Sequence, residues 1–387
     1  MNSIEGRKAE KMRIALVSPS FLPATGGAEI VVHNLALEWG KQGHEVRVFN
    51  WLSGDVTHPD ATYSVRKFDL LRGAPKVGYH RFPWGWYTRR QLARQLSEFA
   101  PDCMSVHMAY PTGFYLDGLI RDCPYVITCH GGDLTKFDWG FRQKYAIDSI
   151  LRSALENCTG AIAISSVARS LMEELGVDPG RILDIPNGVD LQRFRSSVDF
   201  DLREHFGLDR SKQIVLSVGR EHAQKAYPTG LRAFALVADR NLDAHYVLVG
   251  KGNDAHASLC EDLGISDRVT LCEGLYGEDL VGAYQQADVF FSPSIWEMMP
   301  LVVLEAMAAG RPSVVTNISG SQDLVFSGQN GEVVEPGDIE AMAEALARLL
   351  GDPALRLSYS RAMVEQSDNY SWDRVSRLYL DACLGGR

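Results

Sequence analysis

The sequence has no hydrophobic run that approaches the about 18 consecutive apolar residues that a membrane-spanning helix needs. Its first residues, 1 to 12, are charged rather than apolar, so they do not resemble a signal peptide. Its seven cysteines are an odd number without a C-x-x-C pair, which argues against a disulfide framework and against a zinc site. We therefore expect a cytoplasmic protein with reduced thiols.

Several motifs of phosphate and ester chemistry are also missing. The chain contains neither G-x-x-x-x-G-K-[ST] nor G-x-S-x-G, which excludes the common P-loop and hydrolase interpretations. Its only Asp-x-Asp sequence, Asp199 to Asp201, lies in a polar stretch, so no metal site for a nucleotide diphosphate is apparent. We expect a protein that requires neither a metal nor another cofactor.

Basic residues are in deficit, and the formal net charge is -10. Residues 1 to 190 hold equal numbers of acidic and basic side chains, and nucleic acid is not expected as a partner. Residues 64 to 95 differ, because they contain eight Arg or Lys against one Asp, with six aromatic residues among them. We favour a solvated loop and helix here. The alternative is contact with anionic lipid or a lipid-linked acceptor, at the inner face of the membrane.

Short apolar strands alternate with helical patterns along the chain, which predicts an α/β fold with mostly parallel, doubly wound sheets. The pattern opens with a strand, a helix from Ala28 to about Lys41 and a second strand, and it restarts after the polar stretch that follows Asp190. We expect strands at 13–18, 45–50, 103–107, 125–129, 161–165, 182–186, 213–219, 245–250, 268–272, 288–294 and 312–316.

These strands divide into two Rossmann-like domains, residues 1 to 190 and 191 to 371. A chain of 387 residues is long enough to bury more than one core. Ligands of open α/β sheets bind beyond the carboxyl ends of the strands, so two such domains facing each other predict a cleft between them that binds the ligand.

Two glutamates, Glu297 and Glu305, lie eight residues apart. Glu305 is in an otherwise apolar helix, residues 301 to 309, which Gly310 closes. A buried ionised carboxylate costs several kcal/mol unless polar groups satisfy it. Glu305 therefore requires a polar partner, and it could bind vicinal hydroxyl groups of a ligand.

Pro300 fits the first position of that helix, because an N–H group at this position would have no partner within the helix. The N–H groups of Leu301, Val302 and Val303 would then be free at the helix N-terminus, an arrangement that favours a phosphate. We expect Leu301 and Val302 to contribute to ligand binding.

Another candidate site follows the strand at 213–219, which ends in Gly219 and is followed by Arg220 and then Lys225. Arginine offers a planar fork for two phosphate oxygens and lysine a compact charge, so together they could neutralise a diphosphate leaving group. Two exposed cations in a loop are the simpler interpretation, but the position at a strand end favours phosphate.

In the first domain, Gly26 and Gly27 precede the helix that follows the first strand. Glycines there let backbone N–H groups approach an anion, although a lone Gly-Gly is weak evidence. His130 follows the strand at 125–129, where it could hydrogen-bond a sugar hydroxyl or have only a structural role.

Together these residues resemble the retaining nucleotide-sugar glycosyltransferases of family four, which have the GT-B fold. The resemblance covers nearly the whole chain, and the pair Glu297 and Glu305 with its Glu-Ala-Met-Ala continuation is the most specific part. The other matching segments are GGAE (26–29), HGGD (130–133), IPNGVD (185–190), VGR (218–220) with Lys225, LVGKG (248–252), EAMAAGRPSVVT (305–316) and YSWDRV (370–375).

The resemblance implies that the second domain binds the nucleotide-sugar donor. Glu305 would bind the ribose hydroxyls, Arg220 and Lys225 the diphosphate, and Glu297 the hydroxyls of the donor sugar. The first domain would be the acceptor side.

In that first domain, the resemblance implies that Gly26 and Gly27 approach phosphate and acceptor, and that His130 contacts the donor sugar. It also implies that the final helix, residues 372 to 387, packs back on the first domain.

The chain departs from the family pattern at two places. Members of the family often have Glu-Gly-Phe-Gly-Leu where this chain has Glu297-Met-Met-Pro300-Leu301, so Pro300 removes a backbone donor near the sugar. A glycine often follows the lysine at the position that Ala226 occupies here.

We expect transfer of a sugar from a nucleotide diphosphate sugar, with a UDP-sugar favoured and GDP-mannose next, to a glycan or lipid-linked acceptor in polysaccharide or glycoconjugate synthesis. The sequence assigns no carboxylate nucleophile, and the resemblance implies retention through front-face departure of the diphosphate. The alternatives are a sugar-nucleotide epimerase or a phosphorylase on the same fold, and a non-catalytic subunit that binds a nucleotide sugar.

Overall fold

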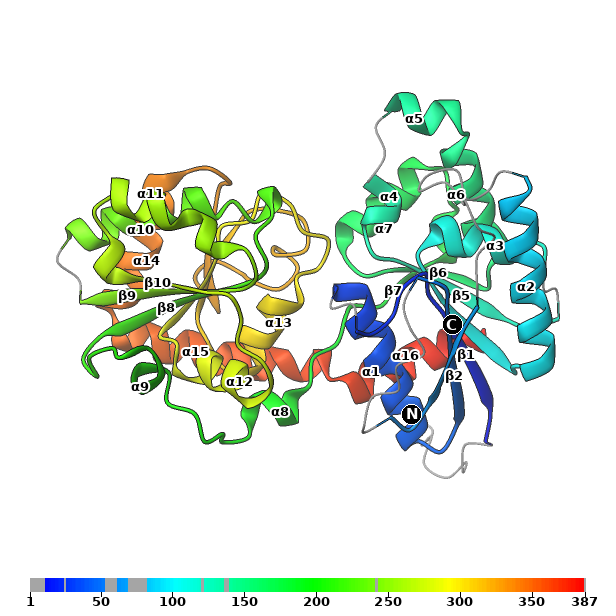
Figure 1. The fold of residues 1–387 in the computed structure, drawn as a ribbon, viewed down its shortest axis with the longest axis horizontal. Coiled ribbons are helices and arrows are strands. Elements are labelled where there is room, and N and C mark those ends of the chain that lie inside the picture. The colour runs from blue at the N-terminus through cyan, green and yellow to red at the C-terminus, as the bar shows by residue number, and fades with distance from the viewer. Residues whose placement is uncertain are drawn as a thin grey trace. The chain divides into compact units, whose positions relative to one another are not determined.

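A computed structural model describes residues 11–23, 26–52, 61–68, 82–119, 122–135, 139–240 and 243–385. The chain divides into two compact units (Figure 1). Unit 1 comprises residues 1–186 and 372–387, and unit 2 comprises residues 187–371. The boundary falls within the IPNGVD segment, four residues before Asp190.

In unit 1, the described residues form a parallel seven-stranded sheet in the order β3-β2-β1-β4-β5-β6-β7. The strands are β1 (Arg13–Val17), β2 (Glu45–Asn50), β3 (Ser64–Lys67), β4 (Cys103–His107), β5 (Tyr125–Cys129), β6 (Gly160–Ala163) and β7 (Ile182–Asp184). The helices are α1 (Gly27–Lys41), α2 (Trp84–Phe99), α3 (Phe114–Leu116), α4 (Gly132–Thr135), α5 (Trp139–Lys144), α6 (Ile147–Asn157), α7 (Ser166–Glu174) and α16 (Trp372–Cys383).

In unit 2, a parallel six-stranded sheet has the order β10-β9-β8-β11-β12-β13. Its strands are β8 (Gln213–Val218), β9 (Ala244–Val249), β10 (Val269–Cys272), β11 (Val289–Ser292), β12 (Ser313–Thr316) and β13 (Gly331–Val334). Its helices are α8 (Leu191–Arg195), α9 (Leu202–Phe206), α10 (Tyr227–Asp239), α11 (Ala257–Asp262), α12 (Gly277–Gln286), α13 (Leu301–Ala308), α14 (Ile339–Gly351) and α15 (Pro353–Ser367).

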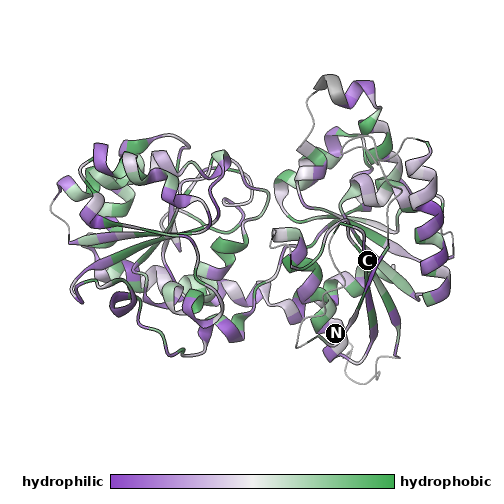
Figure 2. Cartoon of the chain, viewed as in Figure 1, coloured by the Kyte–Doolittle hydropathy of each residue, from purple (hydrophilic) through white to green (hydrophobic). Residues whose placement is uncertain are grey.

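The predicted α/β class with parallel, doubly wound sheets is confirmed in both units, whose strands are mostly apolar (Figure 2). The strand order reverses between β1 and β4 in unit 1 and between β8 and β11 in unit 2. Crevices for ligands open at such reversals, beyond the carboxyl ends of the strands. The structure adds two strands that the sequence did not predict, β3 and β13, each of four residues.

The last helix, α16, packs against the core of unit 1. The indole Nε1 of Trp39 in α1 donates a hydrogen bond to the Ser376 carbonyl at 3.0 Å. Tyr379 is fully buried, and its hydroxyl accepts a hydrogen bond from Thr128 Oγ1 of β5 at 3.3 Å. α16 therefore completes the hydrophobic core of unit 1 as well as some of its buried hydrogen bonds.

Unit 2 contains a strained residue next to one of the candidate cations. Ala226 precedes α10 and has φ +48° and ψ +36°, the left-handed conformation. This conformation costs a residue with a Cβ atom about 1 to 2 kcal/mol relative to its right-handed alternative. A glycine, which the resembled family often has at this position, would adopt the left-handed conformation without this cost.

We predict that Tyr379→Ala lowers the free energy of unfolding by about 3 to 5 kcal/mol, because it opens a cavity and leaves the Thr128 hydroxyl unpaired. Urea unfolding followed by fluorescence measures this change. Leu378→Ala is the matched control on the same helix, because Leu378 is 37% exposed, and it should change stability by about 0.5 kcal/mol or less. Equal losses in the two variants would contradict the packing described here.

We also predict that Ala226→Gly raises the free energy of unfolding by about 0.5 to 1 kcal/mol, because the relief of left-handed strain exceeds the added chain entropy of the unfolded state. Ala223→Gly, three residues earlier at an exposed position without positive φ, is the control and should be destabilising. Thermal or urea unfolding measures the stability of both variants. Destabilisation by both substitutions would contradict the left-handed strain at Ala226.

Candidate functional site

Lys225 and Glu297 meet beyond the carboxyl ends of two neighbouring strands. Lys225 ends a short 3-10 helix after β8, and Glu297 lies in the loop after β11. Lys225 Nζ is 2.6 Å from Glu297 Oε1, and the two side chains are only 15% and 12% exposed. Ser294 Oγ also donates a hydrogen bond to this oxygen, at 3.4 Å. The contact lies where the strand order of unit 2 reverses, so two residues predicted separately from sequence share one site.

Arg220 is placed differently from Lys225. It follows Gly219 at the end of β8 and is exposed, and within the described residues no ion pair holds its guanidinium group. The backbone just before Arg220 is fixed, because the Gly219 carbonyl accepts hydrogen bonds from Tyr227 Oη and Asn253 Nδ2, each at 3.1 Å. Arg220 thus offers an open cationic fork on a fixed backbone.

Glu305 has the polar partner that its apolar helix requires. The hydroxyl of Tyr284 in α12 donates a hydrogen bond to Glu305 Oε2 at 2.7 Å. Burial raises the pKa of the Glu305 carboxyl, whereas this hydrogen bond and the charges of Arg193 and Lys225 oppose the rise. The sequence did not identify Tyr284 as the partner of Glu305, because a tyrosine in an amphipathic helix resembles an ordinary core residue.

The start of α13 corrects two sequence predictions, that Pro300 is the first helical residue and that the Val303 N–H group is free. Pro300 occupies the N-cap position, with φ -75° and ψ 112°, and Leu301 is the first helical residue. The Val303 N–H group donates to the Pro300 carbonyl at 3.1 Å, so it is not free as expected. The N–H groups of Leu301 and Val302 make no backbone hydrogen bond within the described residues, and these two remain candidates for binding an anion.

The loop from Glu297 to Pro300, where the chain departs from the pattern of the resembled family, is held by buried contacts. Met298 and Met299 are buried, and Asn187 Nδ2 of the IPNGVD segment donates to the Met299 carbonyl at 3.3 Å. Gly320 packs on this loop with φ +82°, where a Cβ atom would lie 2.3 Å from the Met298 carbonyl oxygen. The loop geometry therefore depends on glycine at position 320.

In unit 1, Gly26 is the N-cap of α1 and Gly27 is its first residue, one position before the predicted start. A Cβ atom on Gly26 would lie 2.4 Å from Glu29 Oε2. Glu29 accepts a hydrogen bond from the Ser20 hydroxyl and is in the first turn of the helix. The Glu29 carboxylate ends a flexible side chain that could move aside, so this contact does not require glycine at position 26, and the approach of phosphate stays a prediction.

His130 is held in the turn after β5 by two groups. Its Nε2 atom is 2.8 Å from Nδ1 of His107 at the end of β4. Its backbone N–H group and that of Gly131 donate to Asp133 Oδ1, while the Ala109 N–H group donates to Asp133 Oδ2 at 2.7 Å. Burial lowers the pKa of His130 to about 4, so at neutral pH it acts as an uncharged hydrogen-bonding group. Sequence reasoning assigned neither His107 nor Asp133.

The basic, aromatic stretch at 64–95 is described only at 64–68 and 82–95, and the remainder lies outside the described residues. Phe82 and Trp86 near the start of α2 are 80% and 55% exposed. No described helix is both long enough and apolar enough to cross a membrane. Within the described ranges, no group of three His, Cys, Asp or Glu side chains is arranged to hold a metal ion.

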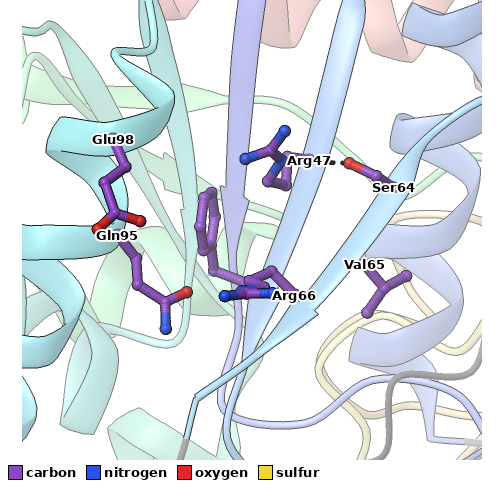
Figure 3. Close-up of a pocket in the computed structure, with 7 residues that line it drawn as sticks. Arg47, Ser64, Val65, Arg66, Gln95 and Glu98 are labelled. Carbon is purple, nitrogen blue, oxygen red and sulfur yellow. Dashed lines mark hydrogen bonds between the residues drawn. The ribbon is translucent and has the colours of Figure 1, made fainter.

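A separate cavity of about 360 Å³ lies between β2, β3 and α2 (Figure 3). Arg47 and Arg66 project from the strands, while Gln95 and Glu98 project from α2. None of the predicted site residues lines this cavity. The cavity is therefore not part of the candidate site around Lys225 and Glu297.

Comparisons with known proteins agree with these motifs. The family model for "Glycosyltransferase Family 4" matches residues 25–193, and that for "Glycosyl transferases group 1" matches residues 199–366. The chain is 29% identical to a phosphatidyl-myo-inositol mannosyltransferase of Mycolicibacterium smegmatis, over 94% of this chain and 92% of the relative. It is 33% identical to the UDP-Gal:alpha-D-GlcNAc-diphosphoundecaprenol alpha-1,3-galactosyltransferase of Escherichia coli, over 54% and 57% of the two chains.

A solved structure supports the fold. Sucrose-phosphate synthase from Thermosynechococcus elongatus is similar with a TM-score of 0.76, covering 96% of this chain and 99% of that one, at 23% identity. The paired Rossmann-like units, the two family models and this similarity lead to one assignment. The chain belongs to glycosyltransferase family four and has the GT-B fold.

Proposed function

We propose that this protein transfers a sugar from a nucleotide diphosphate sugar to a glycan or lipid-linked acceptor, with retention of configuration at the anomeric carbon. The observation that carries the proposal is the contact of Lys225 with Glu297 at the strand reversal of unit 2. It joins a cation suited to phosphate with a carboxylate suited to sugar hydroxyls, at the edge where open α/β sheets bind ligands.

The remaining groups of unit 2 fit the other parts of such a donor. Glu305 uses Oε2 to accept from Tyr284, which leaves Oε1 to accept hydrogen bonds from ribose hydroxyls. Arg220 is exposed and can bind two phosphate oxygens. The N–H groups of Leu301 and Val302 supply donors at a helix N-terminus for the same diphosphate.

The reaction proposed is a front-face displacement. The bond between the anomeric carbon and the diphosphate oxygen breaks while the acceptor oxygen bonds to the same face of the sugar. The acceptor proton passes to the departing diphosphate oxygen, so the products are a nucleoside diphosphate and a glycoside. Arg220 and Lys225 stabilise the charge that develops on the leaving group, the task that a metal ion performs in other enzymes. No metal or other cofactor is part of this proposal.

The names of the relatives support the donor and acceptor classes. The Escherichia coli relative is named for a UDP-galactose donor and an acceptor linked to diphosphoundecaprenol, and the Mycolicibacterium relative is named for mannosyl transfer. We therefore place UDP-sugars first and GDP-mannose second. A lipid-linked acceptor agrees with a peripheral contact at the inner face of the membrane through residues 64–95, where Phe82 and Trp86 are exposed.

We predict that Arg220→Ala and Lys225→Ala each lower kcat by about 100- to 1,000-fold, with or without magnesium, because each removes a charge that stabilises the leaving group. Nucleotide release measures kcat. Arg232→Ala, which removes an exposed arginine from α10, should leave kcat unchanged. Unfolding is measured in parallel, because Lys225→Ala leaves Glu297 buried without its cation. Wild-type turnover in both site variants would refute the assignment.

We further predict that the protein slowly hydrolyses one donor from a panel of UDP-, GDP- and ADP-sugars, and that a UDP-sugar is that donor. Glu305→Gln should weaken this activity and nucleotide binding together, since the ribose hydroxyls lose an ionised acceptor. Chromatography of the released nucleotide identifies the base. Formation of an isomeric sugar nucleotide would instead indicate an epimerase, and sugar 1-phosphate formed with inorganic phosphate a phosphorylase. Binding without turnover, even with crude acceptor, would indicate a non-catalytic subunit.

A further inference from the structure

A chain of three buried or half-buried side chains ends at His130. His107 and His130 lie close together because β4 and β5 are neighbouring strands, and His107 is paired with Thr128 in the sheet register. The atoms His107 Nδ1 and His130 Nε2 are 2.8 Å apart. His107 Nε2 is 3.2 Å from the hydroxyl oxygen of Ser105, two residues earlier in β4.

The ring of His107 is fixed in place. Ser105 and His107 are both fully buried. The His107 ring lies edge to edge with that of His130, with ring centres 5.1 Å apart, and it stacks on Tyr379 of α16 with centres 6.4 Å apart and an interplanar angle of 13°. Because packing holds the ring, its two nitrogens keep their partners, and only the tautomeric state of each histidine remains to be determined.

Both imidazoles are neutral at pH 7. Burial lowers the pKa of His130 to about 4, and burial together with the charge of a protonated His130 lowers the pKa of His107. A neutral imidazole carries one proton on two nitrogens, so one nitrogen donates and the other accepts. The short contact between the rings therefore contains a single proton, which belongs either to His107 Nδ1 or to His130 Nε2.

The Ser105 hydroxyl decides between these arrangements. Within the described residues its one hydrogen-bond partner is His107 Nε2. If His107 Nε2 carried a proton, Ser105 would accept that bond and its own buried hydroxyl hydrogen would be left without an acceptor, which is costly. If Ser105 donates to His107 Nε2, the Ser105 hydroxyl and both ring nitrogens of His107 are satisfied, and His107 donates from Nδ1 to His130 Nε2.

We propose that His107 is a positioning residue which, together with Ser105, holds His130 in the Nδ1–H tautomer. His130 then presents Nδ1–H as a hydrogen-bond donor, and this atom makes no hydrogen bond to any described residue. The ligand that suits it is an oxygen atom, such as a hydroxyl oxygen of the donor sugar or the acceptor. The same tautomer excludes His130 Nδ1 as a general base. This inference rests on the proposed function only for the nature of the ligand.

The first test is an imidazole nitrogen-proton correlation spectrum of the ¹⁵N-labelled, ligand-free wild-type protein. A protonated and an unprotonated ring nitrogen have widely separated nitrogen shifts, so the spectrum reports the tautomer of each neutral histidine. We expect His130 with its proton on Nδ1 and His107 with its proton on Nδ1. A proton on His130 Nε2 would overturn the proposal, and this result needs no variant and no substrate.

The second test removes the hydroxyl with Ser105→Ala. Without that donor neither arrangement satisfies His107 Nε2, so the preference disappears, and the spectrum should show both tautomers of His130. We expect kcat to fall roughly 10-fold, the factor that corresponds to loss of about one net hydrogen bond, with a smaller change in KM for the donor. Ser313→Ala is the matched control, because Ser313 is an equally buried strand serine in unit 2 whose hydroxyl donates to the Arg311 carbonyl.

The two tests separate this inference from the function on which it rests. Unchanged His130 tautomer and unchanged kcat in Ser105→Ala, as in Ser313→Ala, would overturn the role of the Ser105–His107 chain. Wild-type protein that neither binds nor turns over any nucleotide sugar would overturn the proposed function instead. The wild-type spectrum would still decide the tautomer in that case.

Discussion

The ion pair between Lys225 and Glu297 is the contact on which the candidate site of unit 2 depends. It joins the loops after β8 and β11, and both side chains are largely buried, so the loss of either charge would leave the other unpaired at a cost of about 3 to 5 kcal/mol. In the proposed function the donor's phosphates share the charge of Lys225 when they bind. The pair thus holds Lys225 in position before the donor arrives, and in the proposed function Glu297 would contact the sugar attached to the diphosphate.

The carboxylates of the pair Glu297 and Glu305 are satisfied by different partners. Glu297 has a cation at 2.6 Å, whereas Glu305 has the neutral hydroxyl of Tyr284 at 2.7 Å, and burial raises the pKa of Glu305. A carboxylate with one neutral partner retains most of its capacity to accept hydrogen bonds, which suits it to vicinal hydroxyls. Tyr284 is itself held between aromatic rings, with the centres of Phe194 and Phe290 at 5.4 and 5.7 Å, so the position of Glu305 is set by packing.

Periodicity was sufficient to predict the α/β class and most strands, because apolar runs such as that of β1 are bounded by polar turns. It missed β3 and β13, since Ser64–Lys67 and Gly331–Val334 are short edge strands with little apolar pattern. The candidate residues were found from motifs, but their partners Tyr284 and His107 were not. Both partners look like ordinary core residues in the sequence, and only the order of the strands and the packing of helices on them brings them to the site.

In unit 1, packing brings together residues that are far apart in the sequence. Tyr379 lies 249 residues beyond His130 in the sequence, yet its ring stacks on His107 and its hydroxyl pairs with Thr128 in the strand that leads to His130. The fully buried faces of β4 and β5 need an apolar cover, and the aromatic ring of α16 supplies it where the strands end. The same ring packs against the ring of His107, with centres 6.4 Å apart. The final helix therefore contributes to the hydrogen-bonding state of His130 through packing alone, because a ring that could turn would not keep its nitrogens opposite Ser105 and His130.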